Sequence, residues 1–183
     1  DVFVVGNIGI PYTEIVENLT KESVAVAEVS SFQLETTIDF HPQVSAILNI
    51  TPDHLDRHHT MENYITAKLD IAKNQTDKDT CILNYEDSVL QEAAKKISAR
   101  IVWFSSERKL SDGLYLEGDK IIFADHGILK TVCNIHELNI IGRHNYENVM
   151  AAVAAGLAME IPMESIRKAL KSFVAVEHRI EYV

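Results

Sequence analysis

The sequence has few cysteines and no long apolar segment. Cys81 and Cys133 are its only two cysteines among 183 residues, and they match no metal-binding or redox spacing. No apolar run is long enough to span a bilayer, and no basic segment is followed by an apolar signal region. These absences argue against a disulfide-rich secreted protein and against a membrane protein. We therefore expect a cytoplasmic protein whose two thiols lie in the core.

Positive charge is also scarce. The chain carries 17 Lys and Arg against 27 Asp and Glu, which gives a formal net charge of -10. This balance argues against a broad nucleic-acid surface, although a local basic pocket could still bind a phosphate. Since 46% of the residues are hydrophobic, the chain can bury the core of one domain. We expect a monomer with no nucleic-acid or membrane partner.

Both ends of the chain suggest a piece of a longer protein. The sequence does not begin with Met, and Val2–Val5 is already an apolar run typical of a buried parallel strand. Residues 180–183 have just begun a new alternation of apolar and polar positions. We therefore expect further sequence on both sides.

Short apolar runs alternate with stretches of helical periodicity. This pattern predicts an α/β fold with a mostly parallel sheet flanked by helices. Between residues 114 and 132 the pattern changes to short alternating runs separated by Gly118-Asp119 and His126-Gly127, which predicts a small antiparallel β flap. The expected strands cover 2–5, 23–29, 44–50, 80–84, 101–104 and 138–141, and the expected helices cover 13–19, 86–97, 145–159 and 163–173, with another beginning near Thr60.

The first three expected strands end in polar residues. Asn7 follows the first strand, Glu28 lies at the end of the second, and Asp53 with His54 follows the third. If the strands are parallel, these residues share one edge of the sheet, where open α/β sheets bind ligands. A carboxylate and an imidazole there could hold a hard cation together with polyphosphate, and magnesium needs few protein ligands. His58 and His59 are further candidate ligands.

A lysine in the helix after Thr60 is placed unusually. Lys68 lies four residues after Tyr64 and four before Ala72, so its stem falls within the apolar face. Unless the helix ends early, the amine is sheltered from water, and a charged amine is costly there. An uncharged amine is a nucleophile.

Three short stretches allow more than one interpretation. Gly6-Asn7-Ile8-Gly9 fits a ligand-binding loop or a tight turn with unusual backbone angles. Ser30-Ser31 lacks a Gly-x-Ser-x-Gly elbow, which favours a helix cap over a nucleophile. Asn145 and Asn148 lie three residues apart at the start of a helix, where they could contact a base or ribose, although capping explains one of them.

Two other functional classes remain compatible with these residues. His54, Asp56, His58 and His59 could bind zinc or manganese in a metal-dependent hydrolase. The same chain could also be a non-catalytic nucleotide-binding module. The first alternative predicts tightly held transition metal, and the second predicts that Lys68 is dispensable.

Five motifs in order resemble those of the Mur ligase family. They are GNIGIP, Glu28-x-Ser-Ser-Phe-Gln-Leu-Glu, NITPDHLDRH followed by Tyr64-x-x-Ala-Lys68, Gly142-x-His-Asn-x-x-Asn148, and a late His-Arg. Within the family they are most similar to the members that join D-glutamate to UDP-N-acetylmuramoyl-L-alanine. The resemblance implies a P-loop NTPase-like central domain. It also implies ATP-dependent amide formation through an acyl phosphate during cell-wall synthesis.

The resemblance also implies roles for individual residues. Glu28 and His54 would bind magnesium ions, and Lys68 would be carbamylated and help to bind the second ion. Carbon dioxide adds only to an uncharged amine, which agrees with the sheltered position expected for Lys68. The remaining roles are substrate contact for Asn7, Ser31 and His54, adenine contact for Asn148 and Asn145, and ATP phosphate contact for Arg179.

One family motif is missing from the chain. No G-x-x-x-x-G-K-[ST] phosphate loop occurs in it, and the family places that loop before GNIG. We expect residues 1–183 to be the central ATP-binding domain, truncated at its start. The amino-terminal domain for the UDP moiety and the carboxyl-terminal domain for D-glutamate would be absent. The fragment alone should therefore be inactive.

Overall fold

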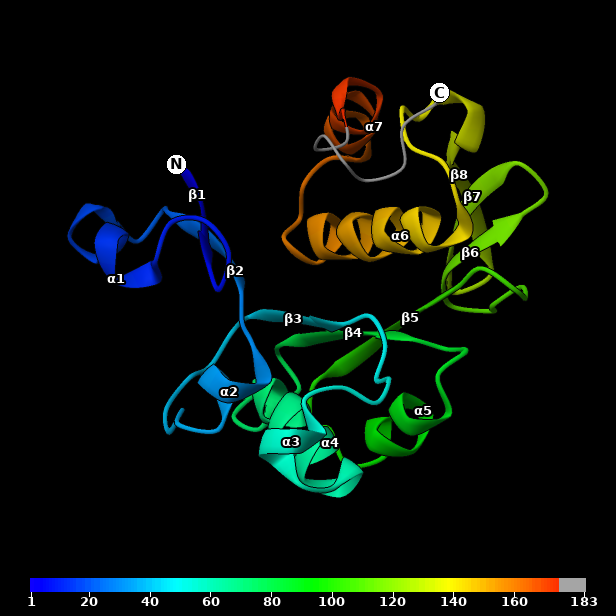
Figure 1. Ribbon diagram of the computed structural model, residues 1–183. Coiled ribbons are helices and arrows are strands. Elements are labelled where there is room, and N and C mark those ends of the chain that lie inside the picture. Colours follow the sequence, from blue (N-terminus) through cyan, green and yellow to red (C-terminus); the bar gives the residue numbers. More distant parts are fainter. Residues whose placement is uncertain (175–183) are drawn as a thin grey trace, which may run out of the picture. The chain divides into compact units, whose positions relative to one another are not determined.

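The structure, a computed structural model, describes residues 1–174 and confirms the predicted α/β class (Figure 1). The chain divides into two compact units. Unit 1 comprises residues 1–40 and 53–71, and unit 2 comprises residues 41–52 and the chain from residue 72 onward. Each unit has its own sheet. Within residues 1–174, none of the helices has the length and apolar character needed to cross a bilayer.

Unit 1 is built on a two-stranded parallel sheet. Strands β1 (Val2–Gly6) and β2 (Val24–Glu28) pair in register from Val2 opposite Val24 to Gly6 opposite Glu28. The expected helix after Thr60 is also confirmed, because the Thr60 hydroxyl accepts a hydrogen bond from the Asn63 amide at 3.1 Å. The helical elements of unit 1 are α1 (Tyr12–Ile15), the 3-10 turn η1 (Val16–Asn18), α2 (Ser31–Leu34), α3 (Leu55–His58) and α4 (Met61–Leu69), after which the 3-10 turn η2 (Asp70–Ala72) leads into unit 2.

The Gly6–Gly9 stretch forms a tight turn against β2. Gly6 has a φ of +128°, and its amide donates to the Ile10 carbonyl at 2.9 Å. The next amide, of Asn7, donates to the Glu28 carbonyl at 2.8 Å. A Cβ on Gly6 would lie 2.0 Å from that same carbonyl oxygen. The turn interpretation of the glycines is therefore confirmed, and Gly6 brings Asn7 beside Glu28.

Gly6→Ala should destabilise unit 1 strongly. The added Cβ would overlap backbone atoms of β2, and a positive φ is strained for alanine, so we expect a loss of roughly 2–4 kcal/mol. Gly9→Ala is the matched control, because Gly9 also has a positive φ but a Cβ there meets nothing within 4 Å. Its expected loss is about 1 kcal/mol. Urea denaturation of both variants measures the difference, and equal losses would show that the close approach to β2 is unimportant.

Unit 2 is built on one six-stranded sheet in the order β3–β4–β5–β6–β7–β8. The pairs from β3 to β6 are parallel, and β6 to β8 are antiparallel, so the predicted flap is confirmed as a continuation of the parallel sheet. The strand expected at 138–141 is not found within residues 1–174, where Asn139 makes only an isolated bridge to Val174. The elements are β3 (Val44–Ile47), β4 (Thr80–Asn84), β5 (Arg100–Ser105), β6 (Gly113–Glu117), β7 (Lys120–Asp125), β8 (Ile128–Asn134) and the 3-10 turn η3 (Ile135–Glu137).

The first three strands were predicted to end at one edge of the same sheet, and the structure confirms this for only two of them. Glu28 ends β2 and Asn7 directly follows β1, its parallel neighbour, so these two residues do lie at the same edge. The third strand, β3, instead pairs with β4 and belongs to the other sheet. Apolar periodicity identifies a strand but does not identify its partner, which is why the sequence could not separate the two sheets.

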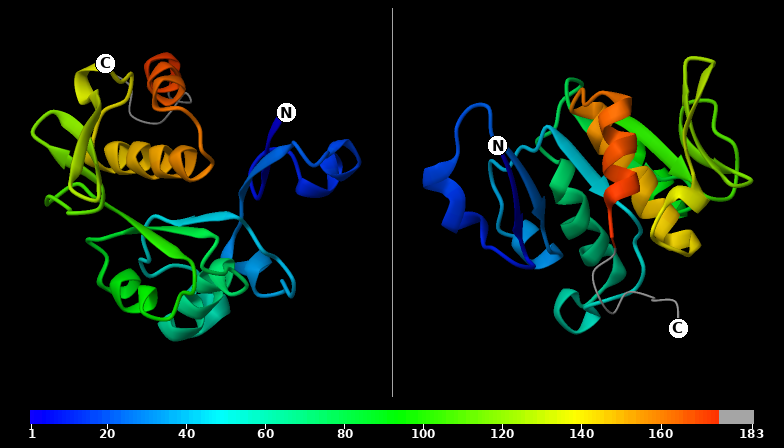
Figure 2. Two further views of the ribbon diagram at one scale, coloured as in Figure 1. Left: turned by 180° about the vertical axis from the view of Figure 1, so that it is seen from behind. Right: turned by 90° about the horizontal axis from the view of Figure 1, so that it is seen from above.

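The core of unit 2 lies between its sheet and helix α6 (Arg143–Ala158). This helix runs across the strands β3 to β6, while α5 (Ser88–Ala94) packs against β4 on the other side (Figures 1 and 2). Helix α7 (Met163–Ser172) packs on α6 and β8. A Cβ on Gly156 would lie 3.1 Å from Ile166 Cδ1, so the small residue allows α7 to approach closely.

Both cysteines are buried, as expected, and Cys133 belongs to this core. Cys81 and Cys133 are buried free thiols, and burial raises the pKa of each to about 11. Iodoacetamide at pH 8 should therefore modify neither residue until the protein unfolds, because the reactive thiolate is scarce and covered. As the folded pKa is raised, the stability contributed by each neutral thiol is complete below pH 9 and falls as the pH rises towards 11. Mass spectrometry after alkylation with and without urea tests this, and rapid labelling of the folded protein would contradict it.

Candidate functional site

Two of the predicted site residues meet at the end of the β1–β2 sheet. Asn7 Nδ2 donates to Glu28 Oε1 at 3.4 Å, and the side chains of both residues are exposed. The Glu28 carboxylate therefore keeps most of its acceptor positions open to a ligand. This geometry is that of a carboxylate oriented by a neighbouring amide at the carboxyl end of parallel strands.

His54 adopts a strained backbone conformation. It has φ 53° and ψ 29°, in the left-handed region that is unfavourable for most residues other than glycine, and it directly precedes α3. Asp53 stabilises this turn, because its Oδ1 accepts from the His54 amide at 2.8 Å and its Oδ2 lies 3.4 Å from Nε2. The His54 ring contacts Phe32 with ring centroids 5.0 Å apart, yet the side chain is 49% exposed. A strained, half-open imidazole of this kind is a candidate binding group.

Lys68 is less sheltered than the sequence predicted. Its side chain is half-buried, and Nζ lies 5.4 Å from the centroid of the Tyr64 ring, in a cation–π contact. The buried positions of α4 are Tyr64 and Ala67. Helix α4 ends at Leu69, directly after the lysine, so Lys68 lies in its last turn. The amine is therefore placed against an aromatic ring at the end of the helix.

His58 is not available as a metal ligand. The residue is 3% exposed, and both ring nitrogens already have partners, Ser31 Oγ at 2.9 Å from Nε2 and Glu35 Oε1 at 3.0 Å from Nδ1. Across residues 1–174, no group of three or more His, Cys, Asp or Glu side chains is placed to hold a metal ion. The expectation that His58 joins a histidine-rich metal cluster is therefore wrong, and the hydrolase alternative loses a central ligand.

The remaining donors fit magnesium better than a transition metal. Glu28 offers carboxylate oxygens and His54 an imidazole, and a carbamate on Lys68 would add two more oxygens. Magnesium keeps several waters and binds substrate phosphates, so it does not need a closed set of protein ligands. A catalytic zinc site would need three protein ligands, and residues 1–174 hold no group of three His, Cys, Asp or Glu placed to bind a metal.

The two serines after β2 have separate structural partners. Ser30 caps α2, because its hydroxyl accepts from the Gln33 amide at 3.3 Å while Gln33 Oε1 accepts from the Ser30 amide at 2.9 Å. The helix-cap interpretation is thus confirmed for Ser30. The hydroxyl of Ser31 is buried against His58, so the geometry does not favour its expected contact with substrate.

The predicted nucleotide residues lie at the first turns of α6 in unit 2. Asn145 Nδ2 donates to the Ile141 carbonyl at 2.7 Å, so local structure accounts for this amide. Asn148 is exposed, and its side chain makes no hydrogen bond within residues 1–174. Asn148 is therefore the amide available to a base. Arg179, the predicted phosphate contact, lies outside the described residues.

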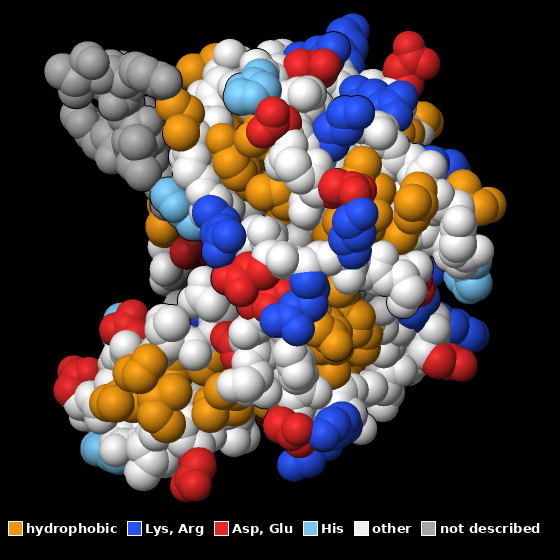
Figure 3. Space-filling view, turned by 90° about the vertical axis from the view of Figure 1, so that its right-hand side faces the viewer, with side chains coloured by type: hydrophobic (Ala, Val, Ile, Leu, Met, Phe, Trp, Pro, Cys, Tyr) orange, Lys and Arg blue, Asp and Glu red, His pale blue; other side chains and the backbone are white. Residues whose placement is uncertain are grey.

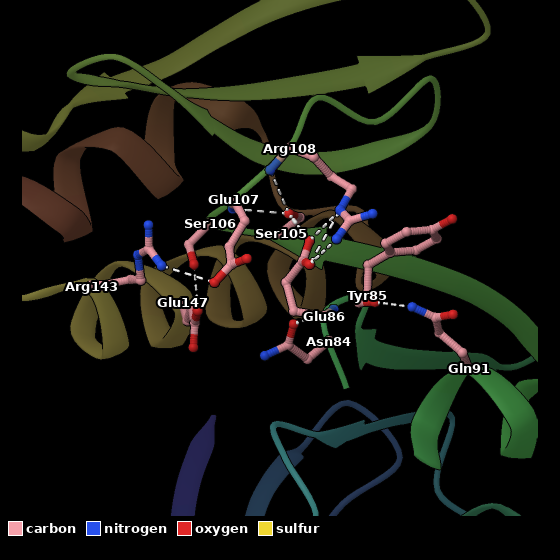
Figure 4. A network of polar contacts seen from close by, with 10 residues as sticks. All are labelled: Asn84, Tyr85, Glu86, Gln91, Ser105, Ser106, Glu107, Arg108, Arg143 and Glu147. Atoms are coloured by element: carbon pink, nitrogen blue, oxygen red, sulfur yellow. Dashed lines mark hydrogen bonds and ion pairs between the residues drawn. The ribbon is translucent and has the colours of Figure 1, made fainter. Parts of the chain in front are cut away.

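A polar network at the ends of β4 and β5 was missed by the sequence analysis (Figure 4). Ser105 donates to Glu86 Oε1 at 2.5 Å, and Arg108 Nε donates to the same carboxylate at 2.9 Å. Burial raises the pKa of Glu86, but its bonds to Arg108 and Ser105 outweigh burial and hold the pKa below the usual value. The adjacent ends of two parallel strands, at Asn84 and Ser105, were the signal that could have revealed this network.

The same network secures the start of α6. Ser106 donates to Glu147 Oε1 at 2.5 Å, and Arg143 Nη1 donates to Glu107 Oε1 at 2.9 Å. Figure 4 shows both contacts reaching from the loop after β5 to the helix. Acidic and basic side chains also lie next to one another on the face of the molecule drawn in Figure 3. The helix that carries Asn148 is therefore tied to the sheet by two polar contacts.

Residues 6–156 match the family model described as Mur ligase middle domain. The chain is 62% identical over 182 residues to UDP-N-acetylmuramoylalanine--D-glutamate ligase of Lachnoclostridium phytofermentans, which covers 100% of this chain and 40% of that protein. The protein of the same name from Clostridioides difficile is 48% identical over 183 residues, again 100% of this chain and 40% of the relative. The chain thus spans about 40% of the length of these relatives.

Solved structures support the fold. MurF from Acinetobacter baumannii matches 100% of this chain and 47% of its own, with a TM-score of 0.64 at 20% identity. MurF ligase from Thermotoga maritima in complex with ADP matches 97% of this chain and 43% of its own, with a TM-score of 0.63 at 18% identity. At such low identities these structures establish the shared architecture only.

Proposed function

Because this chain belongs to the Mur ligase family and matches its middle domain, we propose that the full-length protein is the cytoplasmic ligase that joins D-glutamate to UDP-N-acetylmuramoyl-L-alanine. The observation that carries this proposal is the 62% identity along 182 residues to a relative named for that reaction. The proposal concerns the full-length protein, since the chain spans 40% of that relative.

The proposed reaction makes an amide in two steps. ATP first phosphorylates the carboxylate of the muramoyl substrate, and the amine of D-glutamate then displaces phosphate from the acyl phosphate. Magnesium supplies positive charge that offsets the negative charge of the phosphates during transfer. In this proposal Glu28 and His54 contribute donors to magnesium, and Lys68 contributes a carbamate after reacting with carbon dioxide. The exposed carboxylate of Glu28 and the half-buried side chain of Lys68 beside the Tyr64 ring support these roles.

Other residues are proposed to hold the two substrates. Asn7 and His54 contact the muramoyl substrate, and both side chains are exposed. Asn148 contacts adenine through its open amide, with Asn145 shaping the turn beside it. Arg179 is proposed to contact the ATP phosphates. Ser31 is proposed to act through His58 instead of touching substrate.

Residues 1–183 are proposed to be the central ATP-binding domain of a monomeric enzyme. The missing phosphate-loop motif and the 40% coverage of relatives support this assignment. Residues 1–183 alone are expected to form no amide, because they span 40% of the relative and contain no phosphate-loop motif.

A coupled assay tests the proposed function. The full-length protein is incubated with UDP-N-acetylmuramoyl-L-alanine, D-glutamate, ATP and magnesium, and both phosphate release and the amide product are measured. We expect equal amounts of phosphate and product, and neither without D-glutamate or magnesium. ATP-independent hydrolysis would favour the hydrolase alternative. Nucleotide binding with no product from any amino acid would favour a non-catalytic module.

A further inference from the structure

The most extensively bonded histidine in unit 1 is His58. Its side chain is 1% exposed, and its ring lies between a serine hydroxyl and a carboxylate, with Ser31 on Nε2 and Glu35 on Nδ1. A neutral imidazole has one donor and one acceptor nitrogen. Since a carboxylate only accepts, Nδ1 carries a proton toward Glu35, and in the neutral ring Nε2 accepts from the Ser31 hydroxyl. The two neighbours therefore determine the orientation of the ring.

The Ser31 bond connects His58 to the segment that carries Glu28. Ser31 begins α2, three residues after Glu28, and Ser30 caps that helix. Glu35, which directly follows α2, binds Nδ1 of His58 and also accepts from Arg57 Nη2 at 3.0 Å. Both ends of α2 are thus bonded to α3, and the strand end that presents Glu28 is held close to that junction.

Aromatic contacts connect His58 to the other two predicted ligands. The Phe32 ring stacks on His58 at 5.2 Å with an interplanar angle of 18°, and it also contacts the His54 ring at 5.0 Å. Tyr64 also contacts His58, with ring centroids 5.2 Å apart, and the amine of Lys68 lies over the Tyr64 ring. A continuous chain of contacts therefore connects His54 through Phe32, His58 and Tyr64 to Lys68.

We propose that His58 is a positioning residue that holds the segments bearing Glu28, His54 and Lys68 in one arrangement for magnesium. This inference rests on the proposed function, because magnesium is the ligand it serves. None of the three candidate ligands is bonded directly to another in the described contacts. His54 and Lys68 are each two contacts from His58, and Glu28 lies three residues before Ser31, which is bonded to His58. A buried side chain that makes two polar contacts and two ring contacts can hold these segments in a fixed arrangement, whereas an exposed side chain without such contacts cannot.

The test uses His58→Gln in the full-length ligase, with Ser31→Ala as the second variant. Both remove the Ser31–His58 contact as it stands, while Ser31→Ala changes the buried volume least. Outer-shell partners of metal ligands typically contribute 10- to 100-fold to metal affinity. We expect the magnesium concentration for half-maximal activity to rise about tenfold or more in both variants. The affinity for Mn²⁺ with ADP, measured by electron paramagnetic resonance without turnover, should fall by a similar factor.

His126→Asn is the matched control, because His126 is an exposed histidine at a hairpin turn of unit 2 with a positive φ that asparagine tolerates. It should leave both readouts unchanged.

A lower melting temperature with unchanged magnesium dependence and Mn²⁺ affinity in the two variants would overturn the inference and leave a structural role. If the wild type forms no amide but the variants still lose Mn²⁺ affinity, the proposed reaction is wrong and the positioning role stands. If His58→Gln fails to fold, Ser31→Ala decides by the same two readouts.

Discussion

In the full-length protein, if the proposed ligase reaction is correct, Lys68→Ala should nearly abolish amide formation. The substitution removes the nitrogen that would carry the carbamate, and with it the oxygens offered to magnesium beside the phosphates. Metal stabilisation of phosphoryl transfer amounts to several kcal/mol, so we expect activity to fall roughly a thousandfold. The initial rate of phosphate release and product formation, at saturating ATP and substrates, measures the effect. Added short-chain carboxylates should restore part of the rate, because they can occupy the position of the missing carbamate.

The control for this variant is Lys21→Ala. Lys21 is an exposed lysine of unit 1 in the loop before β2, so its removal changes the charge of the unit equally. It should retain the wild-type rate. Retained activity in Lys68→Ala would exclude a carbamate role and favour the non-catalytic or hydrolase alternatives. Loss of activity without any rescue by carboxylates would indicate a structural role for Lys68, through its contact with Tyr64, in place of a carbamate.

Glu28→Gln should lower activity by about two orders of magnitude, the cost of losing one charge-stabilising group in an active site. Glutamine keeps the size of the side chain and can still bond to Asn7, so β1 and β2 should remain paired. What is lost is the negative charge that attracts magnesium. The expected kinetic signature is a higher magnesium requirement, with activity partly restored as the magnesium concentration rises.

Glu62→Gln is the matched control for this substitution. Glu62 is exposed in the first turn of α4, in the same unit as Glu28, and has no proposed part in the reaction. Its magnesium titration should overlay that of the wild type. An unchanged titration in Glu28→Gln as well would remove this carboxylate from the proposed metal site.

Local sequence signals predicted most of the elements correctly. Thr60 was identified as an N-cap, the strand at 80–84 has the predicted bounds, and the Gly118-Asp119 and His126-Gly127 turns separate three antiparallel strands. These features depend on residues close together in the chain. Strand partners depend on long-range packing, and for this reason the separation of β3 from β1 and β2 was not predicted.

The candidate site could be predicted in its residue types but not in its burial. Glu28 and His54 stood out because charged or polar residues at strand ends need a reason to be there. His58 and His59 looked equivalent in sequence, yet α3 turns His58 into the protein, where Ser31 and Glu35 bind it, and leaves His59 exposed. The degree of shelter of Lys68 depended on where α4 ends, which sequence periodicity defines poorly.

Pulsed electron paramagnetic resonance on the full-length protein tests whether His54 and a carbamate on Lys68 bind the metal. Mn²⁺ replaces magnesium in the presence of ADP, with ¹⁵N-labelled histidine in the protein and ¹³C-labelled bicarbonate in the buffer. We expect a ¹⁵N coupling that disappears in His54→Ala and a ¹³C coupling that disappears in Lys68→Ala. A nucleotide-bound Mn²⁺ that shows neither coupling in the wild-type protein would contradict a metal site formed by His54 and a carbamate on Lys68.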